Sequence, residues 1–130
     1  MSSETDPLES LVVSQTEVAT DSIASALQGL VSIVKETGEV MPIGGFSGLD
    51  VNSKILAYLL GLRAAVILGL GRQISTTAEE VADIVGVDPQ RAREYLSRAK
   101  RKFLLKTRDG WQLPVVRVAA ACDELKKKRK

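Results

Sequence analysis

The chain contains no histidine, and this absence removes several kinds of chemistry at once. A histidine general base, a histidine metal ligand and a Ser-His-Asp triad are all excluded. The single cysteine, Cys122, cannot form an intramolecular disulfide, which fits a reducing compartment. The glycine-rich stretches lack the residues of a phosphate-binding loop, and no carboxylates stand at a metal-binding spacing. We therefore expect no enzyme, no catalytic residue, no metal and no cofactor.

Aromatic residues and long apolar runs are also scarce. The chain has only two Phe, two Tyr and one Trp, although its apolar content of 45% is ordinary for a globular protein. The longest apolar stretch, residues 55–70, is shorter than the about 20 residues of a membrane-spanning helix, and Arg63 interrupts it. The start Met-Ser-Ser-Glu-Thr-Asp has no basic residue and no apolar run, unlike a secretion signal. We expect a cytoplasmic protein without membrane contact.

Positive charge is what the C-terminal part has in excess. Residues 1–85 contain 4 Lys and Arg against 11 Asp and Glu, whereas residues 86–130 contain 14 against 5. The formal net charge of +2 therefore hides a strongly basic end. Such a concentration of positive charge is typical of nucleic-acid-binding proteins, because neutralisation of phosphates supplies most non-specific affinity. Residues 126–130 form a basic tail that either adds to this affinity or stays solvated.

The N-terminal part is expected to be an extension of the main domain. We expect residues 1–15 to be flexible. Residues 16–49 are predicted to form a helix from about Thr16 to Lys35 and then a glycine-rich loop. The helix is indicated by apolar residues at helical spacing, namely Ile23, Leu27, Leu30 and Val34.

A second helix is predicted from Asp50 to about Leu70, with glycines 69 and 71 at its end. One face carries large apolar residues and another carries small residues at every fourth position. A helix that is apolar on both faces must be covered on both, one by the core and the other by the first helix or by a second subunit. We expect a homodimer, and the residues predicted to form its interface are Ile23, Leu27, Leu30, Val34, Ala57, Gly61 and Ala65.

Two further helices separated by a tight turn are predicted after residue 75. Thr76 and Thr77 are each followed three residues later by a glutamate, which is the spacing of a capping box. Gly86 supplies the turn, and Asp88 with the proline after it opens a helix that continues to about Lys102.

Within residues 78–97, small residues stand at positions 82, 86 and 92, where two helices cross closely, and apolar residues surround them. The apolar positions are Val81, Val85, Val87, Tyr95 and Leu96. In this pattern the chain resembles the winged helix-turn-helix DNA-binding domains. The resemblance covers residues 50–125 and implies a mainly α fold with a small β-hairpin wing, preceded here by the helical extension.

The resemblance implies that the last of these helices enters the major groove of DNA. Its apolar face, which includes Ala92, Leu96 and Ala99, would pack on the core. The residues implied to contact bases lie on the opposite face: Gln90, Arg93, Glu94 and Ser97. The residues implied to contact the DNA backbone from this helix are Arg91, Arg98, Lys100, Arg101 and Lys102. A solvated charged helix is the alternative.

The wing is predicted at residues 103–114, with Lys106 and Arg108 as further contacts to the DNA backbone. A three-residue loop at 108–110 pairs Thr107 with Trp111 and places Lys106 on the face opposite Trp111. A two-residue loop at 109–110 places Lys106 and Trp111 on one face. We favour the first register because it gathers the apolar residues on one side. A last helix is predicted over residues 115–130.

These features together predict sequence-dependent binding of double-stranded DNA by a homodimeric transcriptional regulator. Its two recognition helices would reach successive major grooves about one helical turn apart. Two alternatives remain at this point. One is a winged-helix protein-interaction module in a larger assembly, with the acidic N-terminal half as the docking surface. The other is a plasmid- or virus-encoded replication or partition factor that binds DNA with the same chemistry.

Overall fold

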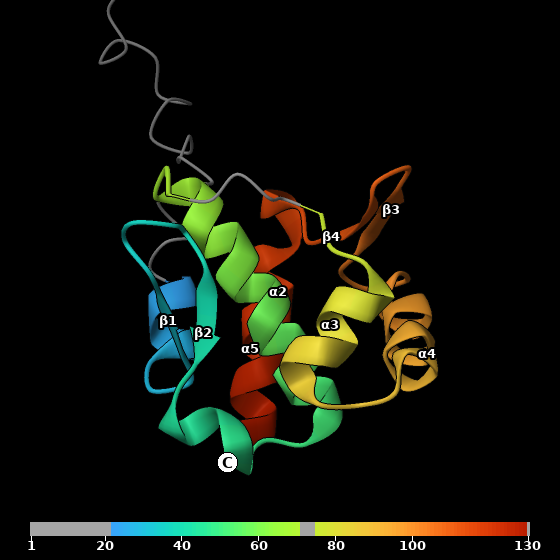
Figure 1. Cartoon of the computed structure of the whole chain (residues 1–130), viewed down its shortest axis with the longest axis horizontal. Helices are drawn as coiled ribbons and strands as arrows, with labels where there is room; N and C mark the ends of the chain where they lie inside the picture. The colour runs from blue at the N-terminus through green and yellow to red at the C-terminus, as the bar shows by residue number, and fades with distance from the viewer. Residues whose placement is uncertain (1–21, 71–74, 130) are drawn as a thin grey trace, which may run out of the picture.

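The computed structural model describes residues 22–70 and 75–129, and it is mainly helical with two small antiparallel hairpins (Figure 1). This confirms the predicted class of a helical fold with a small β component. The described part begins with helical residues 22–27. The elements that follow are β1 (Val31–Ile33), β2 (Val40–Pro42), the 3₁₀ helix η3 (Gly44–Gly48), α2 (Val51–Ile67), α3 (Ala78–Val85), α4 (Pro89–Ala99), β3 (Leu105–Thr107), β4 (Gly110–Gln112), the 3₁₀ helix η4 (Val115–Arg117) and α5 (Val118–Arg129).

The helix α2 runs through the middle of the fold, with the β1–β2 hairpin on one side and α3 and α5 on others (Figure 1). The Asp50 side chain caps it by accepting a hydrogen bond from the Ser53 amide at 2.7 Å, as predicted. Gly69, with a φ of +76°, follows its end. Apolar residues on all sides of α2 are buried, which explains why its sequence has no polar face.

The predicted helix from Thr16 to Lys35 is wrong beyond residue 27, and its first residues lie outside the described part of the chain. Gly29 takes a φ of +81°, which a helix interior does not accommodate, and the chain turns there. Residues 31–33 then pair antiparallel with residues 40–42, which were predicted as loop. The β-branched Val31, Ile33 and Val40 favour this pairing.

The β1–β2 hairpin covers the small-residue face of α2. A Cβ atom added at Gly61 would lie 2.7 Å from Val40 Cγ1, so only glycine allows the hairpin to approach this closely. Ala57 and Ala65 are 0% and 1% exposed.

The predicted homodimer interface is therefore wrong as a free surface, because the same chain already covers most of it. Six of its seven residues are buried, and Val34 is half-buried. The buried six are Ile23, Leu27, Leu30, Ala57, Gly61 and Ala65.

The helices α3 and α4 follow their predicted caps. Thr77 and Glu80 form the capping box, and Gly86 turns the chain with a φ of +85°. Asp88 accepts a hydrogen bond from the Gln90 amide at 2.9 Å, and α4 ends at Ala99, three residues before its predicted end.

The β3–β4 hairpin has neither of the two registers considered from the sequence. Lys106 pairs with Trp111 and Thr107 with Gly110, which leaves a two-residue loop at residues 108 and 109. The register depends on Thr76, whose amide and carbonyl exchange two hydrogen bonds of 2.8 Å with Trp111. A Cβ atom at Gly110 would clash with the Thr76 carbonyl oxygen. Gly110 therefore belongs in the strand and not in the loop.

The chain ends in α5, which covers α2. Val118, Cys122 and Leu125 are at most 1% exposed and form the buried side of this helix. Burial raises the pKa of Cys122 to about 11. Across residues 22–70 and 75–129, every helix is too short or too polar to cross a bilayer.

Candidate nucleic-acid interface

The helix α4 has one buried and one exposed face, as its sequence predicts. Ala92 and Leu96 are 0% exposed, and Ala99 is 5% exposed. They belong to the hydrophobic core, in which α4 packs against α3. Because this side is fixed in the core, the opposite side of α4 is held rigidly at the surface.

All eleven residues predicted to contact DNA are exposed. Six of them surround a shallow depression along the outer face of α4: Gln90, Arg91, Arg93, Glu94, Ser97 and Arg98. Lys100, Arg101 and Lys102 follow at the C-terminal end of the helix, where they project from a turn. The structure thus brings the predicted base contacts together on one surface and places basic residues beside them.

The β3–β4 hairpin lies on the same side of the molecule as α4, away from the β1–β2 hairpin (Figure 1). Arg108 is exposed at its loop. The ammonium group of Lys106 lies over the Trp111 ring, 5.0 Å from its centroid, which is a cation–π distance. Trp111 itself is only 8% exposed, so it stabilises the hairpin and offers little surface for stacking on a base.

Arg63 ties this hairpin to the central helix, a role that sequence reasoning missed. Its Nε donates to the Leu113 carbonyl at 2.9 Å and its Nη2 to Gln112 Oε1 at 3.3 Å. Burial lowers the pKa of Arg63 from its usual value. The signal in the sequence is an arginine inside an apolar run. On sequence grounds this arginine argues only against a membrane-spanning helix.

Arg117 is a second basic residue that the sequence did not assign to the site. It is exposed on η4, and its Nη1 donates to the Lys102 carbonyl at 3.2 Å. This contact brings a further positive charge to the end of α4, where the last carbonyls attract cations. No local pattern relates residues 102 and 117, so only the fold could reveal the pair.

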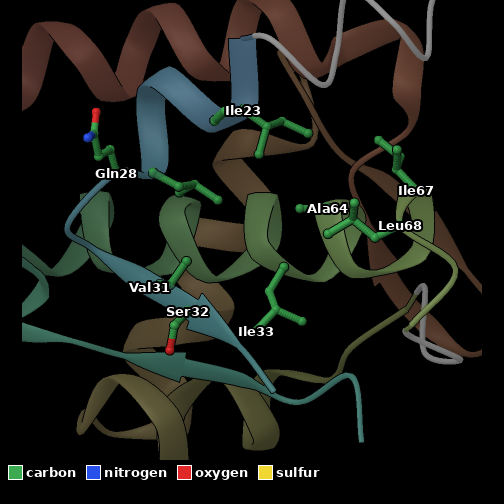
Figure 2. A pocket seen from close by; sticks show the side chains of 10 residues that line it. Ile23, Gln28, Val31, Ser32, Ile33, Ala64, Ile67 and Leu68 are labelled. Carbon is green, nitrogen blue, oxygen red and sulfur yellow. The ribbon is translucent and has the colours of Figure 1, made fainter. Parts of the chain in front are cut away.

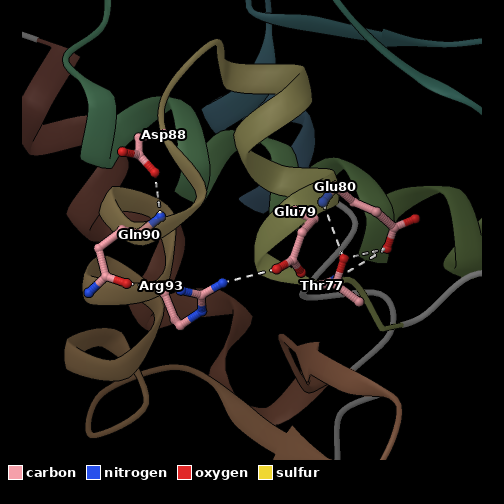
Figure 3. Close-up of polar contacts among 6 residues, drawn as sticks. All are labelled: Thr77, Glu79, Glu80, Asp88, Gln90 and Arg93. Carbon is pink, nitrogen blue, oxygen red and sulfur yellow. Dashed lines mark hydrogen bonds and ion pairs between the residues drawn. The ribbon is translucent and has the colours of Figure 1, made fainter.

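Arg93 is held by two neighbours in the free protein (Figure 3). Its Nη2 forms a 2.9 Å ion pair with Glu79 of α3, and its Nη1 donates to Gln90 Oε1, also at 2.9 Å. Both charged side chains are well exposed, at 47% and 66%, and such pairs contribute only about 0–1 kcal/mol. Any anionic ligand of Arg93 would therefore have to compete with the Glu79 carboxylate for the guanidinium group.

The other cations of α4 and of the turn after it are not held by a carboxylate of the part of the chain that the structure describes. Among residues 22–70 and 75–129, no other cation of α4 or of the turn after it forms an ion pair with a carboxylate. Arg98 makes only a long 3.5 Å hydrogen bond to the Glu94 carbonyl. These groups can rearrange freely around phosphates, which suits contacts that carry charge and not sequence.

The surface offers positive charge, hydrogen-bond donors and a rigid helix, which are features suited to binding a negatively charged ligand. The depression along α4 is lined by polar and charged residues of this helix. Comparisons of the chain with protein-family models, with curated proteins and with solved structures found no match.

Proposed function

We propose that the protein binds double-stranded DNA through α4 and the β3–β4 hairpin, in the manner of a winged helix-turn-helix protein, and acts as a transcriptional regulator. The observation that carries this proposal is the division of α4. All of its candidate DNA contacts are exposed, while Ala92, Leu96 and Ala99 anchor its other face in the core.

The chemistry of the exposed face fits the major groove, which is wide enough to admit an α-helix. Arg93 can donate to guanine, Gln90 to adenine, and Glu94 can accept from cytosine. The unpaired cations at the end of α4 would neutralise phosphates and set the position of the helix. Lys106 and Arg108 extend the same positive surface onto the β3–β4 hairpin.

A homodimer belongs to this proposal, but it needs a face other than the predicted one. The small-residue stripe of α2 is already covered by β1 and β2, so it cannot also hold a partner. With a two-fold axis elsewhere, two copies of α4 would read a roughly palindromic site. Light scattering of the protein, alone and with duplex DNA, measures whether one or two copies are bound.

The direct test is fluorescence anisotropy of a labelled duplex across a salt series. Affinity should fall by at least tenfold between about 50 and 200 mM salt, because each neutralised phosphate releases counterions. The double variant Arg98→Ala, Lys102→Ala should bind more weakly and show a shallower salt dependence, by about two phosphate contacts.

The matched control is Lys35→Ala, which removes an exposed cation two residues after the end of β1, a strand that lies away from α4 (Figure 1). It should bind duplex DNA like the unmodified protein. If the unmodified protein shows no salt-dependent affinity for any duplex, the proposed function is wrong. If Lys35→Ala weakens binding as much as the double variant, the charge acts without a defined surface and α4 is not the interface.

A further inference from the structure

An apolar groove lies on the other side of the molecule from α4, between the helical residues 22–27, β1 and the end of α2 (Figure 2). Its volume is about 390 Å³, and its polar lining is confined to Gln28 and Ser32. Figure 2 shows apolar side chains converging on it from all three elements, among them Ile23, Val31, Ile33, Ile67 and Leu68.

The groove leaves apolar side chains in contact with water. Leu68 is 59% exposed, and Val31, Ile33 and Ile67 are only partly covered. None of the elements within residues 22–70 and 75–129 closes this side. Converging apolar walls of this kind are a common mark of a binding surface, because burying them is favourable.

We propose that residues 8–19 of the same chain occupy this groove. The described part begins at Ser22, and Ile23 is already a wall of the groove, so the 21 preceding residues enter at its edge. Within them, apolar residues recur at the spacing of one helical face: Leu8, Leu11, Val12, Val18 and Ala19. This stripe spans residues predicted to be flexible, up to residue 15, and the start of the helix predicted from Thr16.

Covalent attachment favours this segment over any separate occupant. Ala19 is three residues from Ser22, a span of at most about 11 Å, so the stripe begins within reach of the groove. A short tether gives an effective concentration in the millimolar range, which no free partner matches easily.

The size of the groove points to the same occupant. Its volume is that of a small-molecule pocket, enough for a few side chains. A second copy of the chain needs a surface of about 1,200 Å² or more for a stable interface, and this groove alone does not offer it.

The charge of the segment allows its two possible docking sites, the apolar groove and the basic face of α4, to be told apart by salt. The first 34 residues contain no Lys or Arg and several carboxylates. Such a segment could be drawn to the basic face by charge alone. Docking in the groove, by contrast, depends on apolar contact and persists in high salt.

Two neighbouring valines provide a matched test. On a helix, Val12 belongs to the apolar stripe, whereas Val13 points about 100° away from it. The variant Val12→Asp should lower the melting temperature by several degrees and raise the fluorescence of an added apolar dye, 8-anilinonaphthalene-1-sulfonate, several-fold. The variant Val13→Asp should leave both near their original values. Equal effects of the two variants, or bright dye fluorescence with the unmodified protein, would overturn the proposal.

A double-mutant cycle tests contact with the groove itself. The effects of Val12→Ala and Leu68→Ala on urea unfolding should be non-additive, since contacting residues couple. Those of Val13→Ala and Leu68→Ala should simply add. The first coupling should survive 1 M NaCl. Its loss in salt would place the segment on the basic surface, and a dimer that Leu68→Asp dissociates would place a second copy in the groove. Either result overturns the proposal, and neither bears on DNA binding.

Discussion

The helices α2 and α4 have opposite relations to solvent. Eleven of the 17 residues of α2 are buried, whereas in α4 only Ala92, Leu96 and Ala99 of its 11 residues are. Both faces of α2 pack against other elements, namely the β1–β2 hairpin, α3 and α5. One face of α4 packs in the core, and the other carries basic and polar side chains exposed to solvent. Their difference indicates that α2 holds the fold together, whereas α4 keeps one face exposed to solvent.

The largest expected effect is at the centre of α2. Leu60 is 0% exposed, so Leu60→Ala should lower the free energy of unfolding by about 2–5 kcal/mol through lost burial and the cavity that remains. Ser97→Ala, on the exposed face of α4, should change it by less than about 0.5 kcal/mol. Urea denaturation followed by circular dichroism measures both. Similar losses at the two sites would remove the contrast between the helices.

The close contact between α2 and β2 gives the next effect. Gly61→Ala would place a methyl group 2.7 Å from Val40 Cγ1, so it should cost about 1–3 kcal/mol of stability. Gly44→Ala is the matched control, because a Cβ atom there meets nothing within 4 Å. A thermal melt that shows Gly61→Ala to be as stable as Gly44→Ala would mean that the hairpin does not press on α2.

A smaller effect is expected on the binding face of α4, provided that the protein binds DNA. Glu79→Gln releases Arg93 from its ion pair and should tighten duplex binding a few-fold, since the pair contributes about 0–1 kcal/mol. Asp83→Asn makes the same charge change on α3 without touching Arg93 and should have less effect. Anisotropy at one fixed salt concentration compares them. Equal gains would show that only net charge matters.

The last prediction concerns Cys122, which is buried in α5. Burial raises its pKa from 9.0 to about 11 in the folded protein. The folded state therefore holds this proton more tightly, and the stability it contributes is complete below pH 9 and is lost as pH rises towards 11. Native protein at pH 8 should react with a thiol reagent far more slowly than urea-unfolded protein. Equal rates would show that the thiol is accessible.

Local signals in the sequence predicted where α2, α3 and α4 begin. Asp50, Thr77 and Asp88 cap helices because their side chains reach amides only two or three residues away. The two faces of α4 follow from the helical period alone, so its exposed residues could be named from the sequence. Six of the eleven proposed DNA contacts are among these residues.

Contacts between distant residues decided what the sequence left open. Ile23, Leu27, Leu30 and Val34 fit a helical stripe, yet the chain turns at Gly29 and pairs β1 with β2 over α2. The register of β3 and β4 depends on Thr76, far earlier in the chain.

The sequence by itself determined the helix caps, the orientation of α4 and the concentration of positive charge, because each depends on residues within one or two turns. Only the tertiary structure decided that the small-residue face of α2 is covered, that Glu79 holds Arg93 and that an apolar groove remains beside residues 22–27. These features arise where segments meet that are far apart in the chain, and a periodic pattern does not state which partner will cover an apolar face.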